Sequence, residues 1–459
     1  MSSPDPSEAE PGRPRIRWLW TSNPFYIISA GLFLFGLYES FGARNREVDT
    51  WALMGGLAGY TLLLAGAALL LVRFARVWND VRTVLLLVVL MFLATSVTFD
   101  ELLVFEPERG TLFNVGGLGF AIFVSEGLLR GIRLRLPMLF RLPYHLTLCL
   151  FFLYPVALVR LLKDPYGEAM MWGLWGFSAT AGVVFLTLLP AIRRGTEYVR
   201  DNGSPWPWPF YPWSLFVFLA VAVCGRTFLL CWSLHQPLSM GELVFGPHFL
   251  VPFGFALVVI VLELGIVQGH RVTRWVALVA PVGLVVLAGV GHRADAASVE
   301  FLGHFANRLG GSPLFVALVA ATGFYLYAWV RRVPLALEGL TVAVGALAII
   351  GPETLTVASV SGVRAGPLVA ALGIQVLLAL WRRDGWRLVV GGLVAAIWLS
   401  DLAWRWYRVL REDVPGVDYI VAGLALLPVA VLISLGKAGV ITRWWNAGRE
   451  ERVATDEHG

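Results

Sequence analysis

Six ionisable side chains lie within or beside long apolar stretches, and these are the residues that could do chemistry. An isolated charge inside a membrane costs at least about 2.5–3.5 kcal/mol, so each of them must face protein or water. A guanidinium group held there can bind an anion, whereas carboxylates and imidazoles can carry protons. The pattern is typical of a substrate or proton pathway. The six residues are Arg226, Asp401, Glu39, Glu263, His235 and His248.

Arg226 lies well inside a long apolar run, and two acids share its depth. Counted at about 1.5 Å per residue from the inner ends of their helices, Arg226, Asp401 and Glu39 all lie roughly 20–24 Å deep. Their charges are complementary, so we expect Arg226 to be buried against Asp401 or Glu39. The shallower Asp100 is interpreted instead as the point where its helix meets water.

Glu263 lies in the inner third of the next apolar segment, and no basic residue follows or precedes it within one helical turn. Burial without a counter-charge disfavours the carboxylate form. We therefore expect a protonated carboxyl group at Glu263, which a proton-coupled transporter would release when its cavity reaches water. A structural carboxyl group bonded to a neighbouring helix is an equally compatible alternative.

His235 and His248 stand on either side of a short connection on the expected outer side of the membrane. Histidine together with carboxylate is a common ligand set for zinc and other divalent metals. The chain nevertheless contains no HExxH motif or similar fixed spacing. We therefore assign neither a metal nor a cofactor, and we treat both histidines as candidates for substrate contact or coupling.

The elements that must position these residues are membrane helices. Of the 459 residues 58% are hydrophobic and 15% are charged, and apolar runs of about 20 residues recur along the whole chain. This predicts an all-α, polytopic integral membrane protein with about fourteen transmembrane helices in a bundle over 23–435 and no soluble domain. The expected limits are 23–41, 51–72, 81–99, 111–129, 143–162, 168–192, 212–235, 243–267, 273–291, 312–330, 334–352, 364–381, 386–404 and 417–435.

The distribution of arginine and lysine predicts the orientation. If the N-terminus is inside, the cytoplasmic segments hold 24 basic residues and the outer loops hold 11, as the positive-inside rule requires. We expect a multi-pass protein of the cell's inner membrane, with a disordered cytoplasmic tail at 1–22 and a cytoplasmic C-terminal tail at 436–459. The net charge of +5 thus reflects topology and gives no reason to expect a nucleic-acid partner.

The longest outer connection, 292–311, is expected to form an interfacial amphipathic helix. Its apolar and charged side chains separate at helical spacing. The apolar face carries Leu302, Phe305 and Leu309, and the charged face carries Glu300, His304 and Arg308.

Three functions are compatible with this pattern. The leading hypothesis is a secondary transporter or flippase of a polar or lipid-linked anionic substrate, in which Arg226 contacts the substrate's negative charge. Glu39, Asp401 and Glu263 would balance charge or carry protons. One alternative is a membrane-embedded transferase or hydrolase that acts on a lipid-linked substrate at the outer face with histidines and acids, so an enzyme remains open. Another is a structural subunit of a complex, with membrane protein partners beside the lipid bilayer.

Overall fold

The structure is a computed structural model, and the part of the chain that it describes is almost entirely helical. No strand occurs within these described ranges. They are 24–41, 46–75, 77–159, 168–200, 202–206, 210–235, 244–290, 296–309, 311–350, 357–382 and 385–413.

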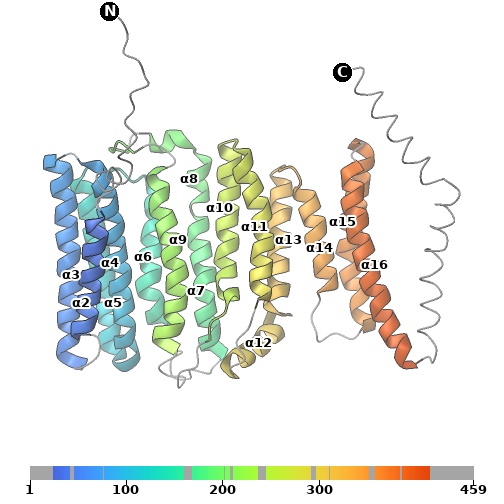
Figure 1. The fold of residues 1–459 in the computed structure, drawn as a ribbon, viewed down its shortest axis with the longest axis horizontal. Coiled ribbons are helices and arrows are strands. Elements are labelled where there is room, and N and C mark those ends of the chain that lie inside the picture. Colours follow the sequence, from blue (N-terminus) through green and yellow to red (C-terminus); the bar gives the residue numbers. More distant parts are fainter. Residues whose placement is uncertain are drawn as a thin grey trace, which may run out of the picture. The chain divides into compact units, whose positions relative to one another are not determined.

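Two compact units divide the chain, residues 1–364 and residues 365–459. In the first unit long helices stand side by side and alternate in direction (Figure 1). Its helices are α2 (Phe25–Phe41), α3 (Arg46–Leu70), the π-helix η1 (Leu71–Ala75), α4 (Trp78–Phe105), α5 (Pro107–Gly131), α6 (Met138–Leu158), α7 (Glu168–Leu186), α8 (Leu189–Arg193), the 3-10 helix η3 (Thr196–Val199), α9 (Phe210–Leu230), the π-helix η4 (Cys231–His235), the 3-10 helix η5 (Pro247–Leu250), α10 (Val251–Val267), α11 (Arg271–Gly289), α12 (Ala296–Leu309), α13 (Pro313–Val330) and α14 (Ala336–Ile349). Helix α15 (Val357–Arg382) contains the boundary, and α16 (Gly385–Asp413) belongs to the second unit.

Ten helices among the described residues are long and apolar enough to cross a membrane, so the chain is a multi-pass membrane protein. Each predicted segment from 23–41 to 386–404 overlaps a helix of the structure. The segment 417–435 and the two predicted tails lie outside the described residues. Some of the overlapping helices are short: α14 has 14 residues, which span about 21 Å.

The two ends of the first unit are distinguished by the short helices that lie there. We call the end that carries α8 the α8 face and the opposite end the α12 face (Figure 1). Helices α4, α6, α9 and α11 begin at the α8 face, whereas α5, α7, α10 and α13 begin at the α12 face.

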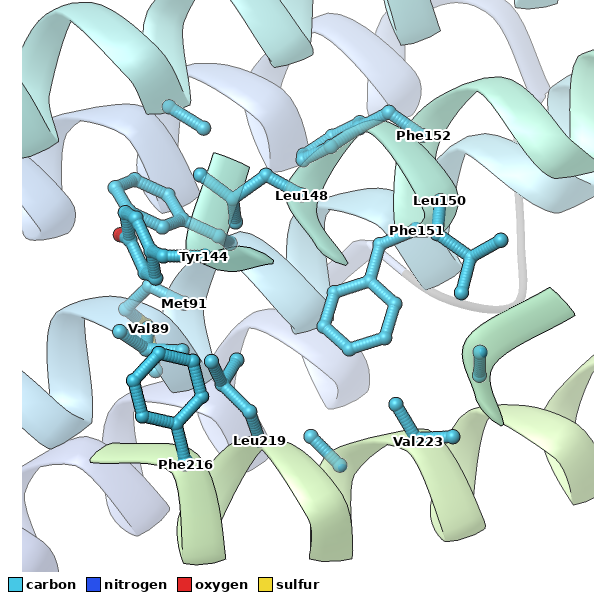
Figure 2. Packing of buried hydrophobic residues seen from close by; sticks show 14 of the residues in the cluster. Val89, Met91, Tyr144, Leu148, Leu150, Phe151, Phe152, Phe216, Leu219 and Val223 are labelled. Atoms are coloured by element: carbon cyan, nitrogen blue, oxygen red, sulfur yellow. The ribbon is translucent and has the colours of Figure 1, made fainter. Parts of the chain in front are cut away.

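The core of the first unit is built where α4, α6 and α9 meet. Phe151 and Leu148 of α6 are fully buried, and they belong to the same apolar cluster as Met91 of α4 and Leu219 of α9 (Figure 2). Helix α5 closes on the same core through Gly117, where a Cβ atom would lie 2.6 Å from the Phe99 ring and 2.8 Å from the Phe152 ring. The missing side chain therefore allows the close helix approach that membrane bundles use.

The predicted amphipathic helix in 292–311 is confirmed as α12. Its apolar face packs on α7, where Phe305 stacks on Trp172 with ring centroids 5.4 Å apart, and Phe301 is also buried. On its polar side Arg308 Nε donates to Glu168 Oε1 at 2.8 Å, and His304 lies 3.9 Å from the same carboxylate. Helix α12 is thus attached to the N-terminus of α7 by both stacking and charge.

Candidate functional site

The side chain of Arg226 is fully buried where α9 passes α4 and α6. Its two terminal nitrogens bind the carboxylate of Asp100: Nη2 donates to Oδ1 at 2.8 Å, and Nη1 donates to Oδ2. Nη2 also reaches the carbonyl oxygen of Phe151 at 3.3 Å. A bidentate, charge-assisted pair of this kind is the strong form of an ion pair. It joins three helices of the core near the α12 face.

Two serines surround this pair, which we call the Arg226 centre. Ser233 Oγ lies 2.7 Å from Asp100 Oδ2, and Ser96 donates to the carbonyl oxygen of Phe151 at 2.7 Å. Ser233 belongs to η4, a π-helical turn of the type often found at functional sites. The Nε atom of Arg226 is buried and has no hydrogen-bond partner among the described residues. The guanidinium group therefore keeps one unused donor.

The prediction that Arg226 is buried against Asp401 or Glu39 was wrong. Glu39 is exposed near the end of α2, and Asp401 of α16 pairs with Arg405 one turn away at 2.8 Å. The cause is a helix boundary: α4 continues to Phe105, six residues beyond its predicted end, so Asp100 lies inside the helix and not at its junction with water.

A second cluster, the Glu263 centre, lies toward the α8 face. Glu263 of α10 is fully buried, and Arg331, which directly follows α13, binds it with Nε 2.8 Å from Oε1 and Nη2 3.0 Å from Oε2. Arg193 of α8 donates to Oε1 at 3.4 Å. The hydroxyl group of Tyr327 also donates to Oε1. Three helices are thus held by one carboxylate.

The expectation of an uncompensated, protonated carboxyl group at Glu263 was therefore wrong. Its counter-charges come from Arg193 and Arg331, which are 70 and 68 residues away in the chain, so inspection of one helical turn does not find them. The side chains of Arg193 and Arg331 are 51% and 36% exposed. Two cations and one carboxylate leave this cluster with an excess positive charge that reaches the α8 face.

The structure describes the surroundings of only one of the two candidate histidines. His235 is the last residue of η4, and its side chain lies outside the described part. His248 of η5 is buried against Phe249, with ring centroids 4.9 Å apart. It borders a cavity of only about 10 Å³, which is room for about one water molecule. Within the described ranges no three His, Cys, Asp or Glu side chains gather as metal ligands would.

Sequence reasoning missed Asp100, Arg193, Tyr327 and Arg331 as members of the two centres. One signal was available, since Tyr327 and Arg331 are four residues apart and share one face at the end of α13. Arg193 gives no comparable signal, because it stands among ordinary helix-end arginines.

Comparison with protein-family models, with curated proteins and with solved structures finds no match to this chain. Its function must be inferred from the two centres themselves.

Proposed function

We propose that the protein is a membrane transporter or flippase for a polar or lipid-linked anion. The observation that supports this best is the Glu263 centre, where one internal carboxylate holds two arginines that reach the α8 face. Carboxylate and phosphate oxygens accept the same hydrogen bonds from a guanidinium group. An anion that arrives at the α8 face therefore competes with Glu263 for Arg193 and Arg331.

The Arg226 centre supplies the second binding step in this proposal. Arg226 lies about one turn before the end of α9, near the α12 face, and Glu263 lies about one turn before the end of α10, near the α8 face. Ion pairs thus fasten the bundle toward both ends, and a carrier with alternating access must open such closures in turn. Once Asp100 releases its guanidinium group, Arg226 binds the anion.

The arginines at the ends of the described helices support the proposed orientation. Those at the α8 face, the proposed cytoplasmic side, outnumber those at the α12 face, where Arg109 and Arg308 lie, and the positive-inside rule relates such a bias to the cytoplasm. We place the protein in the inner membrane of the cell. With fourteen spans, both termini would then lie in the cytoplasm. The arginines of the α8 face include Arg73, Arg130, Arg193, Arg194, Arg271, Arg331 and Arg332.

The geometry is less favourable to a transferase or hydrolase at the α12 face. General acid–base catalysis needs an ionisable group within hydrogen-bond reach of a bound substrate. The small cavity beside His248 is too small to hold a substrate. His304 lies 3.6 Å from Glu300 on the surface of α12.

Transport is tested with the purified full chain in liposomes. The probes are fluorescent phosphatidylglycerol, a fluorescent polyprenyl phosphate and radiolabelled phosphate, each compared with protein-free liposomes. We expect at least one probe to move faster with the wild-type protein and at least tenfold more slowly when both Arg193 and Arg331 are changed to Gln, because two guanidinium contacts are lost.

The matched control is Arg271→Gln, which removes an exposed arginine at the same face without touching Glu263. It should transport like the wild type. If none of the probes moves faster than in protein-free liposomes, the transporter proposal fails and a structural subunit becomes the better interpretation.

A further inference from the structure

A partly open cavity of about 80 Å³ lies toward the α8 face, and none of the residues of the two charge centres lines it. It is enclosed by α4, α5, α6 and the beginning of α9. Most of its wall is aliphatic, with Leu85, Leu86 and Val89 from α4 and Leu128 and Leu129 from α5. An apolar space of this kind stays free of water and accepts apolar ligands.

The polar groups of the wall are mostly satisfied within the protein. Ser125 and Tyr144 hydrogen-bond to each other at 2.7 Å, and Tyr211 donates to the carbonyl oxygen of Arg135 at 3.0 Å. Trp206 differs, because its Nε1–H is buried and has no acceptor among the described residues. A small rotation of the Trp206 indole would therefore bring an unsatisfied donor to the cavity.

The cavity runs from headgroup depth into hydrocarbon depth. Arg82 lies four residues after the start of α4 and Val89 eleven residues after it, so these two lining residues differ in depth by about 10 Å. Arginine and tryptophan at the shallow end are typical of the membrane–water interface. The site thus combines a cationic, donor-bearing mouth with an aliphatic interior.

We propose that this cavity binds one acyl chain of an anionic phospholipid from the leaflet at the α8 face, with the phosphate group beside Arg82 and Trp206. The surrounding bilayer offers acyl chains at high local concentration, and a chain restores the packing contacts that an empty cavity lacks. The headgroup selects the lipid, because a guanidinium group attracts anionic headgroups at a membrane surface. The lipid is a resident ligand, distinct from the transported anion.

The test is photo-crosslinking of the full chain in lipid nanodiscs. Phosphatidylglycerol and phosphatidylcholine that carry the same diazirine in the acyl chain are compared, and the labelled peptides are identified by mass spectrometry. We expect the α4 peptide containing Leu85 and Leu86 to be labelled several-fold more by phosphatidylglycerol. Arg82→Gln should reduce this preference to the phosphatidylcholine level, whereas Arg73→Gln, which changes an exposed arginine on the same face, should leave it intact.

A second variant fills the cavity. Leu86→Trp should reduce labelling by both lipids at least fivefold, whereas Leu63→Trp, at a side chain that is 71% exposed on α3, should not. Size-exclusion profiles confirm that each variant is folded. Equal labelling by the two lipids, or labelling that Leu86→Trp does not reduce, would overturn the proposal. Because the readout is labelling, it stays informative if transport fails, and the Arg193 and Arg331 variants should not change it.

Discussion

The two charge centres use the same chemistry in opposite surroundings. At the Arg226 centre one guanidinium group and one carboxylate are both fully buried. At the Glu263 centre only the carboxylate is buried, and its two arginines are 51% and 36% exposed. A buried pair is expensive to break because the remaining charge has no water, whereas water and ions stabilise an exposed guanidinium group that loses its partner.

This difference sets the cost of opening each ion pair in the proposed transport cycle. Asp100 and Arg226 hold α4 and α9 together at a place that solution does not reach. In the proposed cycle Arg193 and Arg331 exchange Glu263 for an anion, and because both are partly exposed they do not become isolated charges. Ranking the cost of breaking each pair therefore tests whether burial, rather than the number of contacts, determines what a charge centre does.

The largest effect is expected at Asp100. Asp100→Asn leaves Arg226 charged and unpaired in the core, which should reduce the free energy of unfolding by about 3–5 kcal/mol. Unfolding of the purified protein in mixed detergent micelles measures the loss. Replacing both residues, with Asp100→Leu and Arg226→Met together, should recover most of it because no unpaired charge remains. A double variant as unstable as the single one would show that the pair does not act as described.

A smaller effect is expected at Glu263. Glu263→Gln removes the charge but keeps an acceptor, and its arginines reach water, so the loss should be about 1–2 kcal/mol. Both arginines supply the counter-charge that a carboxylate at this position needs. The difference from the wild type should therefore stay constant between about pH 6 and pH 8, measured by the same unfolding assay. If the difference disappears on acidification within this range, the hypothesis of a protonated carboxyl group at Glu263 would be supported again.

The smallest effect is expected at Asp401. Its pair with Arg405 joins side chains that are 27% and 36% exposed and four residues apart on one helix. Asp401→Asn should change the free energy of unfolding by only about 0.3–0.5 kcal/mol. A loss comparable to that of Asp100→Asn would mean that Asp401 has a buried partner after all.

The sequence was sufficient to locate the helices and to single out Arg226 and Glu263, because apolar runs and isolated charges are local signals. Arg226 of α9 and Ser233 of η4 are seven residues apart, a spacing that places them on one side of a helix, and both contact Asp100. The partners of Arg226 and Glu263 could not be identified in this way, because they lie far away in the sequence. Asp100 was missed because α4 extends beyond the predicted segment: the adjacent acids Asp100 and Glu101 interrupt the apolar run, but the helix continues through them to Phe105.

The Glu263 centre was unpredictable for a different reason. Its arginines belong to α8 and the end of α13, and only the packing of α10 against both helices brings them within 3.4 Å of one carboxylate. The starting point of α10 was also missed, since the predicted segment began at 243. Pro247 and Pro252 lie in the first turns of η5 and α10, where proline is well tolerated.

The attachment of α12 to α7 has a consequence for the time course of synthesis. Arg308 follows its partner Glu168 by 140 residues, and a ribosome that adds 5–20 residues per second needs roughly 7–28 s to produce that length. During this delay Trp172 and Trp175 have no aromatic partners from α12. Unpaired tryptophan side chains are nevertheless stable at this position, because their amphipathic rings are favourable at a membrane–water interface. The contact between α7 and α12 is therefore made only after the chain from α8 to α11 has been synthesised.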